Sequence, residues 1–233
     1  MTDIILLLYG DPNDLDRCID SIKEHCSDYK LHIIDNNENN RGFTKAVNEG
    51  IKAGNAPYIW LVNQDAVILE GAQEALIKRF SYSDRVGIAG SMQIDPENND
   101  IIRHGGTIRC FPSGIHKGGY RHMGHCRFPK KQTWVNFASV MIRRSMIEKI
   151  GLLDESMFLL YSDSDYCFTA RQKGYEVWYE PDSKVIHRLN ASKTITEWHK
   201  KDMETFMKKW GIINVGEGRF SFSPEFDRLN RFP

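Results

Sequence analysis

The sequence lacks a net charge, a long apolar run and any internal repeat. Its 31 Lys and Arg residues balance 31 Asp and Glu residues, so no overall field attracts nucleic acid or an acidic membrane, and nucleic-acid binding is not expected. No apolar stretch approaches the roughly 18 residues of a membrane span. The run Ile4–Leu8 is also too short for the apolar core of a signal peptide. The length of 233 residues is enough for one substantial α/β domain or two small ones, and the composition is typical of a soluble globular protein.

Paired cysteines are also missing. The cysteines are odd in number and form no CxxC motif; they are Cys18, Cys26, Cys110, Cys126 and Cys167. Such a pattern is typical of free thiols in a reducing compartment. The sequence therefore predicts a cytoplasmic protein without disulfides.

The two common glycine-rich phosphate-binding motifs are absent as well. Neither GxGxxG nor GxxxxGKS occurs in the sequence, which excludes a dinucleotide fingerprint and a phosphate-binding loop. A nucleotide would then have to be held by side chains and a metal ion.

The most informative stretch that is present is the apolar run Tyr58–Asn63, which is followed closely by Asp65. It predicts a buried parallel strand with a carboxylate at its carboxyl end. The apolar runs Ile4–Leu8 and Leu31–Ile34 predict two earlier strands. A helix between them is predicted by the apolar spacing of Leu15, Cys18, Ile19 and Ile22, and the helical pattern of Phe43–Ala53 completes a βαβαβ unit. Ligands bind outside the carboxyl ends of such strands. Asp65 is therefore expected to meet a metal ion or a phosphate, with a turn-capping role as the alternative.

The second strand also ends in an acid, at Asp35-Asn36, and the block between the two acids is distinctive. It reads Asn40-Arg41-Gly42-Phe43-Thr44-Lys45-Ala46-Val47-Asn48-Glu49-Gly50. This block resembles the N-x-G-f-x-x-a-x-N-x-G signature of family 2 inverting glycosyltransferases, and its spacing from both acids agrees. The form Asn63-Gln64-Asp65, N-x-D rather than D-x-D, is similar to the branch that includes rhamnosyltransferases. The resemblance extends over roughly residues 4 to 190.

The resemblance implies an α/β fold of the GT-A type, with a mostly parallel central sheet flanked by helices. It implies one domain over residues 1–212, in which a nucleotide-sugar-binding half (1–92) precedes an acceptor half (93–212), with a tail at 213–233. It also implies a donor that is a nucleotide-diphosphate sugar, UDP- or dTDP-linked, and a divalent cation, Mn²⁺ or Mg²⁺.

Particular residues take donor-side roles if the resemblance holds. Asp35 would accept a hydrogen bond from the base, and Asp65 would hold the cation against the diphosphate, since hard cations prefer oxygen ligands. The full set implied for the nucleotide-sugar is Tyr9, Asp35, Asn36, Arg41, Gly42, Asn48, Asn63, Gln64 and Asp65. The chain departs from the family at Gly10, where asparagine is usual.

A second centre lies in residues 158–167, which resemble the E-D-x-D-l-c segment of the same family. Asp163 aligns with the catalytic base and Asp165 with the following acid, whereas Ser162 and Thr169 replace the usual Glu and Arg. An inverting transfer needs one carboxylate that takes the proton of the acceptor hydroxyl. The alternatives are a helix N-cap for Asp163 and a first-turn acid for Asp165.

Further residues are implied on the acceptor side and near the cation. The expected strand Thr133–Arg143 carries Asn136 and Ala138, which the resemblance places with Asp165 where acceptor and donor sugar meet. His187 ends a later strand and is either a metal ligand or a structural residue. Two basic residues that follow His187 are candidates for phosphate contacts; they are Arg188 and Lys193.

Two segments leave alternatives open. Residues 109–132 hold three histidines and two cysteines, His116, His122, His125, Cys110 and Cys126; they form either a zinc site or a long excursion over the donor pocket. A basic amphipathic helix is predicted over Thr194–Trp210, which packs on the domain or another subunit, or lies on a membrane surface. The tail from Val215 is not assigned.

The leading hypothesis is an inverting, metal-assisted glycosyltransferase with Asp163 as general base and a glycan or lipid-linked acceptor. It would act in the cytoplasm; contact with the inner face of the membrane and self-association are left open. One alternative is a catalytically silent sugar-nucleotide or glycan-binding module of the same fold. Nucleotidyl transfer is disfavoured because the turn Tyr9-Gly10-Asp11-Pro12 lacks a basic glycine-rich loop.

Overall fold

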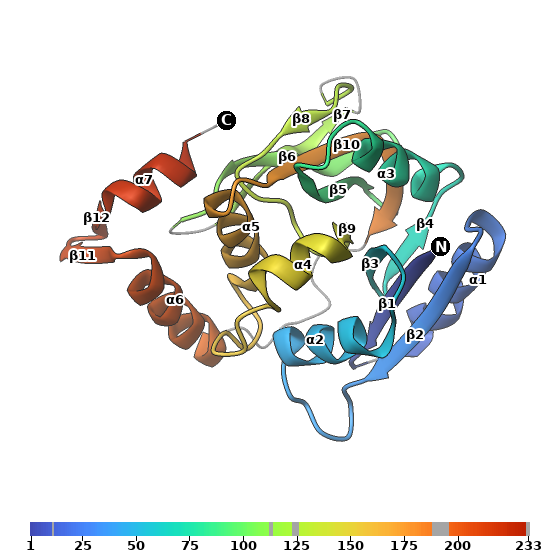
Figure 1. Ribbon diagram of the computed structural model, residues 1–233, viewed down its shortest axis with the longest axis horizontal. Coiled ribbons are helices and arrows are strands. Elements are labelled where there is room, and N and C mark those ends of the chain that lie inside the picture. Colours follow the sequence, from blue (N-terminus) through green and yellow to red (C-terminus); the bar gives the residue numbers. More distant parts are fainter. Residues whose placement is uncertain (11, 112–113, 123–125, 188–195, 232–233) are drawn as a thin grey trace.

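A computed structural model describes residues 1–10, 12–111, 114–122, 126–187 and 196–231. The described residues form a ten-stranded sheet in the order β2-β1-β3-β9-β5-β10-β4, to which β6, β7 and β8 are added, and a separate two-stranded sheet, β11-β12 (Figure 1). The larger sheet forms the centre of the molecule, and helices lie against it.

The strands have the following bounds: β1 Thr2–Leu8, β2 Tyr29–Asp35, β3 Tyr58–Asn63, β4 Ala66–Ile68, β5 Val86–Ile94, β6 Ile101–Arg109, β7 Ile115–His122, β8 Lys130–Lys131, β9 Ser139–Arg143, β10 Glu176–His187, β11 Ile212–Gly216 and β12 Arg219–Phe222. A short 3-10 helix spans Pro12–Asp14, and the α-helices are α1 Leu15–His25, α2 Phe43–Ala53, α3 Ala72–Ser81, α4 Arg144–Ile150, α5 Ser162–Gln172, α6 Thr196–Trp210 and α7 Pro224–Asn230.

Both faces of the sheet are covered, because alternate residues of the inner strands enter different cores. Ile5 of β1 packs in a core with residues of α2, α4 and α5. Its neighbours Ile4 and Leu6 pack in a second core with residues of α1 and α3. A strand that is buried on both faces is apolar at consecutive positions. The continuous apolar runs of the sequence therefore predicted these strands correctly. β1 pairs in parallel with β2 and β3, as predicted.

The sheet is mixed, so the expectation of a mostly parallel sheet was wrong. β9 runs antiparallel to both of its neighbours, β3 and β5, and parallel pairing resumes only between β5 and β10. The predicted strand Thr133–Arg143 is also shorter, since β9 begins at Ser139. The reason is local: the backbone N–H of Ala138 donates to Oδ1 of Asn136 at 2.8 Å, so the segment before β9 turns instead of extending the ladder.

Two glycines of the distinctive block are required by close packing. A Cβ atom on Gly42, which has φ +84°, would lie 2.6 Å from the Phe158 ring, and one on Gly50 would lie 2.4 Å from Ile5. Gly42 lets the chain enter α2 beneath the loop before α5, and Gly50 lets α2 lie against β1. Both separations are too short for a real Cβ atom, which explains glycine at both positions.

Helix α6 is fastened to the loop that precedes α5. The buried carboxylate of Asp202 accepts the backbone N–H groups of Phe158, Leu159 and Leu160, each at 2.8 Å. The packing alternative for this helix is therefore confirmed. Within the described part of the chain, no helix is long and apolar enough to cross a membrane.

The unassigned C-terminal segment folds against the same domain. The hairpin β11–β12 follows α6 directly, and α7 places Phe226 and Leu229 in the core that contains α5. The N–H groups at the start of α7 are capped by Ser223, whose hydroxyl accepts the N–H of Phe226. Figure 1 shows α6, the hairpin and α7 together on one side of the sheet.

Candidate active site

The carboxyl ends of β1 and β3 are joined by one side chain. The amide of Gln64 accepts the backbone N–H of Tyr9 at 2.8 Å and donates to the carbonyl of Tyr9 at 3.0 Å. This double contact fixes the first loop although Gly10 replaces the usual asparagine. The ring of Tyr9 remains 53% exposed, so it is available to a ligand at this edge.

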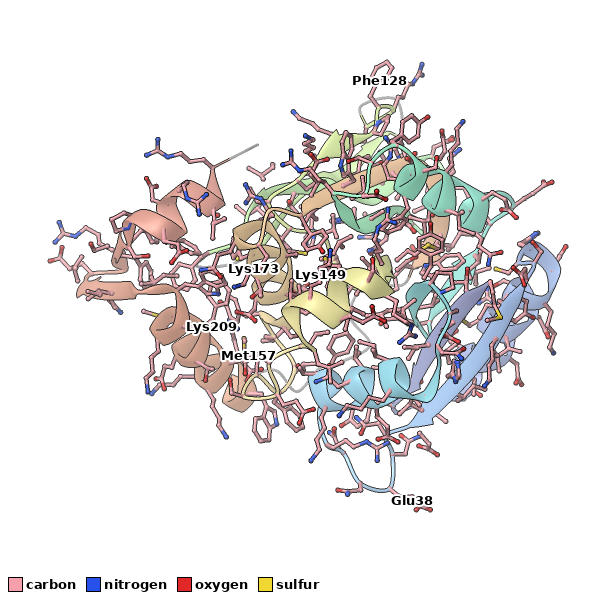
Figure 2. All side chains as sticks on the ribbon, in the orientation of Figure 1. Glu38, Phe128, Lys149, Met157, Lys173 and Lys209 are labelled. Carbon is pink, nitrogen blue, oxygen red and sulfur yellow. The ribbon has the colours of Figure 1, made fainter. Side chains whose placement is uncertain are left out.

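The loop after β2 is built by Asn36, which is buried. Its side-chain oxygen accepts the N–H of Arg41 at 3.1 Å, and its amide donates to Asn40 Oδ1 at 3.2 Å. Asn36 therefore shapes the loop, whose exposed tip carries Glu38 (Figure 2). Asp35 is exposed, with one carboxylate oxygen accepting the N–H of Asn37 at 2.8 Å, so it is the available acceptor in this loop.

Asn48 does not face this edge. It is 1% exposed, and its side chain both donates to the carbonyl of Leu153 at 2.9 Å and accepts the N–H of Leu153 at 3.0 Å. A further bond joins it to Glu155 Oε1 at 3.0 Å. The expected donor contact of Asn48 is thus corrected: every hydrogen-bonding group of its amide is engaged in holding α2 to the turn that follows α4.

Asp65 and His187 form the centre of the site. Asp65 follows β3, His187 ends β10, and Asp65 Oδ1 lies 3.3 Å from His187 Nε2. Their side chains are only 9% and 6% exposed, respectively. Asn63 is the third group here, with Nδ2 3.4 Å from the same imidazole nitrogen. The end of β3 and the end of β10 are therefore brought to one point, as expected if both residues bind a cation.

A glutamine that carries no motif continues this network. Gln93 of β5 lies 3.0 Å from His187 Nδ1 through its Oε1 and donates from Nε2 to Asn136 Oδ1 at 3.0 Å. Ala138, adjacent to β9, donates to Asn136 and accepts the N–H of Asn63 at 2.9 Å. Gln93 was not predicted from the sequence; the available signal was a polar residue within a strand that is buried at every position.

Asp163 lies in the first turn of α5. Burial raises its pKa to about 6, although hydrogen bonds from the N–H and hydroxyl of Ser164 oppose the rise. Tyr161, the residue before α5, has φ +62°, a left-handed conformation that is uncommon for an aromatic side chain. A carboxyl with a pKa close to neutral is suited to accept a proton.

The segment before β9 connects the two centres. Asn136 faces Gln93, whereas its neighbour Phe137 packs edge-on against Tyr166 of α5 with ring centroids 6.5 Å apart. Cys167, on the same helix, hydrogen-bonds to the backbone of Val135. One short segment therefore contacts both the network of His187 and the helix that carries Asp163.

Asp165 points elsewhere. Its buried carboxylate accepts from Lys209 Nζ at 2.7 Å and from Trp210 Nε1 at 2.8 Å (Figure 2 labels Lys209). Lys209 also contacts Asp154 at 3.0 Å. These bonds tie the end of α6 to α5. They give the acceptor-side interpretation of Asp165 no support and favour its alternative, a structural acid.

Residues 1–205 match the family model described as "Glycosyltransferase like family 2". The chain belongs to glycosyltransferase family 2. Its curated relatives include the dTDP-rhamnosyl transferase RfbF of Shigella flexneri, 28% identical over 180 residues, which are 72% of this chain and 56% of that protein. Another is the low-salt glycan biosynthesis hexosyltransferase Agl10 of Haloferax volcanii, 25% identical over 187 residues, 74% of this chain and 57% of that protein. The chain thus spans little more than half the length of these relatives.

Two solved glycosyltransferase structures share the fold of this family 2 chain. GalNAc-T7, solved with UDP, GalNAc and Mn²⁺, has a TM-score of 0.68 at 12% identity, covering 89% of this chain and 47% of that one. Mannosyltransferase PcManGT from Pyrobaculum calidifontis, solved with GDP-Man and Mn²⁺, has a TM-score of 0.62 at 11% identity, covering 98% and 67%. The GT-A-type fold is confirmed.

The histidine- and cysteine-containing segment of this family 2 domain is divided between two places. His116 Nδ1 lies 2.7 Å from His104 Nδ1, whereas Cys110 lies against Ser164 of α5. Among the described residues, no group of three or more His, Cys, Asp or Glu side chains could hold a metal ion, so the zinc alternative has no support there. His125, Arg188 and Lys193 lie outside the described residues.

Proposed function

We propose that the chain is an inverting glycosyltransferase domain that moves a sugar from a nucleotide-diphosphate sugar to an acceptor hydroxyl, assisted by Mn²⁺ or Mg²⁺. The single observation that carries the proposal is the convergence of Asp65 Oδ1 and His187 Nε2, 3.3 Å apart at the carboxyl edge of a family 2 domain. The acid after β3 and the histidine at the end of β10 come from segments far apart in sequence.

The residues present fit a divalent cation. Two ligands on adjacent positions of a hexacoordinate ion, each about 2.1 Å from it, are separated by about 3 Å, close to the spacing of these two atoms. Mg²⁺ and related ions are often held by one or two protein ligands together with substrate phosphates and water, so the pair is sufficient. When bound, the cation would neutralise charge on the departing diphosphate.

Asp163 would take the proton. In the reaction, the acceptor oxygen forms a bond to the anomeric carbon from the face opposite the diphosphate, and the carbon–oxygen bond to the diphosphate breaks with its electron pair. The acceptor proton passes to the carboxylate of Asp163. Because the pKa of Asp163 is about 6, the group is mostly ionised at neutral pH and still basic enough to accept this proton.

The donor base would lie between the first and second loops. Tyr9 offers an exposed ring, and Asp35 offers an exposed carboxylate that can accept the imide N–H of uracil or thymine. A UDP- or dTDP-linked sugar follows from this acceptor, and the name of the Shigella flexneri relative favours dTDP-linked deoxyhexose. The acceptor would be a glycan or a lipid-linked oligosaccharide. We place the reaction in the cytoplasm, where the five free thiols would stay reduced.

A catalytically silent sugar-nucleotide-binding module is the second candidate. It is favoured by one observation: buried Ser162 and partly buried Thr169 occupy the positions of the usual Glu and Arg beside the proposed base. The two candidates differ only in turnover, since each would bind the donor.

A panel of nucleotide-sugar donors distinguishes the glycosyltransferase from the catalytically silent module. Thermal shift would be measured with UDP-, dTDP- and GDP-sugars, each with and without Mn²⁺, followed by release of the nucleoside diphosphate with and without glycan acceptors. We expect one donor class to stabilise the protein only with Mn²⁺ and to be turned over. Stabilisation without hydrolysis or transfer would establish the silent module, and no stabilisation by any donor would overturn both candidates.

A further inference from the structure

The orientation of the Gln93 amide follows from its surroundings. The backbone N–H of Ala138 donates to Asn136 Oδ1 at 2.8 Å. A backbone N–H is only a donor, so the atom of Asn136 that faces it must be the oxygen. Gln93 approaches this same oxygen at 3.0 Å and must therefore present its nitrogen.

The protonation of His187 is then determined at one ring position. With Nε2 of Gln93 turned to Asn136, Oε1 of Gln93 faces Nδ1 of His187 at 3.0 Å. An amide oxygen only accepts, so Nδ1 must carry a proton. Gln93 is wholly buried, at 0% exposed, so water does not compete for this oxygen.

The other ring nitrogen is left with a lone pair in the neutral ring. Nε2 lies 3.3 Å from Asp65 Oδ1 and 3.4 Å from Asn63 Nδ2, which can donate to it. In the neutral ring, the Nε2 lone pair and the Asp65 carboxylate point at the same place, and they repel each other unless a proton or a metal cation lies between them. The arrangement of four side chains thus presents two acceptor atoms to one point.

We propose that Gln93 is a positioning residue that holds His187 in the Nδ1–H tautomer, so that Nε2 is offered with Asp65 to the divalent cation. The inference rests on the proposed function, which places a cation at this pair. Groups that hydrogen-bond the outer nitrogen of a metal-binding histidine fix its tautomer and raise its basicity, and their loss lowers metal affinity by roughly 10- to 100-fold.

Substitutions of Gln93 test its role as a positioning residue. Gln93→Leu keeps a similar volume but removes the acceptor at Nδ1, and we expect Mn²⁺ affinity, measured by electron paramagnetic resonance on the donor-free protein, to fall by about 10- to 100-fold. Gln93→Glu restores an oxygen at Nδ1 but turns its second oxygen to Asn136 Oδ1, so its affinity should lie above that of Gln93→Leu without having to reach the wild-type value. Gln73→Leu is the matched control, since Gln73 is also buried but bonds to Ser27 and Thr2 instead; its Mn²⁺ affinity should be unchanged.

The tautomer itself is measured without metal. Long-range ¹H–¹⁵N correlation spectra of the wild-type protein distinguish Nδ1–H from Nε2–H imidazole, and loss of one signal set in His187→Gln provides the assignment. An Nε2–H tautomer, or equal affinity of Gln93→Leu and wild type, would overturn the proposal. If the wild type shows the Nδ1–H tautomer but binds no Mn²⁺, the cation site of the proposed function is overturned instead. The spectrum needs no variant at Gln93, so the test holds even if Gln93→Leu does not fold.

Discussion

Asn48 and Leu153 form two hydrogen bonds with each other across 105 residues of sequence, with the Asn48 amide donating to the Leu153 carbonyl and accepting its N–H. The two bonds have the pattern of a hydrogen-bonded residue pair in a β-ladder, with the side-chain amide of Asn48 in place of a backbone peptide group. The pair joins α2 to the turn after α4. The placement of α2 against this turn therefore depends on a residue that the family signature would suggest is a ligand contact.

Replacing Asn48 with alanine should lower stability and leave the donor site chemically intact. The substitution strands a buried N–H and a buried carbonyl, and such groups cost about 1 to 3 kcal/mol each. We expect a loss of about 2 to 6 kcal/mol in the free energy of unfolding, measured with urea, and unchanged Mn²⁺ affinity in the folded protein.

Two outcomes distinguish a structural role of Asn48, through its bonds to Leu153, from a role in ligand contact. Asn48→Asp keeps the acceptor for the Leu153 N–H but opposes a carboxylate to the Leu153 carbonyl and to Glu155, so it should also destabilise the fold. Wild-type stability combined with weakened donor binding would restore the ligand role.

Asn48 also shows where prediction from sequence stops. The strands β1 and β3 and the helix α2 were predicted correctly, because apolar periodicity is local and strong. A polar residue on the buried face of a helix has the same pattern whether its partner is a ligand or a distant backbone group. The donor-side edge remains a prediction, and the structure engages one of its expected residues, Asn48, with a distant backbone group instead.

Asp163 and Asp165 show the same limit within one helical turn. Residues two apart on an α-helix point about 200° away from each other, so only one of the pair can face a given cavity. The sequence does not state which, because the orientation of α5 is set by Lys209 and Trp210, more than 40 residues later. Gln93 was missed for a related reason: its partners Asn136 and His187 lie on two segments that are distant in sequence.

Gly42→Ala should disturb the donor loop through sterics and backbone strain together. The new Cβ would lie 2.6 Å from Phe158. The backbone angles of Gly42, φ 84° and ψ 163°, lie in a region occupied almost only by glycine, where another residue costs about 1 to 3 kcal/mol. Gly216→Ala is the matched control, since Gly216 has φ +94° and open space around it. We expect the free energy of unfolding to fall clearly more for Gly42→Ala than for Gly216→Ala. Equal losses would show that contact with Phe158 is unimportant.

Asp65→Ala should abolish the Mn²⁺-dependent part of donor binding. The substitution removes the carboxylate of the pair, and His187 alone is a poor site for a hard cation, which prefers oxygen. We expect the increase in melting temperature caused by donor and Mn²⁺ together to fall to that caused by donor alone. The control is Asp20→Ala, an exposed acid of α1, which should behave as wild type. Undiminished Mn²⁺ dependence in Asp65→Ala would remove Asp65 from the cation site.

Asp163→Asn should abolish transfer and at the same time stabilise the protein. Asparagine cannot accept the acceptor proton, and loss of a general base typically costs about 10² to 10⁴ in rate. Donor affinity should change little, because the residue acts on the acceptor. An unchanged rate would exclude Asp163 as the base.

The stabilisation follows from the raised pKa of Asp163 in the folded protein, about 6 against a usual value of 3.8. A carboxyl whose folded pKa is raised favours folding while it is protonated, below pH 4, and that contribution is lost as pH rises through 6. At pH 7 the ionised group therefore costs up to about 3 kcal/mol, a cost that asparagine does not have. Urea unfolding of Asp163→Asn and wild type should diverge between pH 4 and pH 7, with the variant more stable at neutral pH. The wild-type turnover rate should be half-maximal near pH 6 and level off at about pH 7, because only the ionised carboxylate accepts the proton. A wild-type rate that stays flat from pH 5 to pH 7, or stability curves that remain parallel, would mean that Asp163 does not titrate in this range.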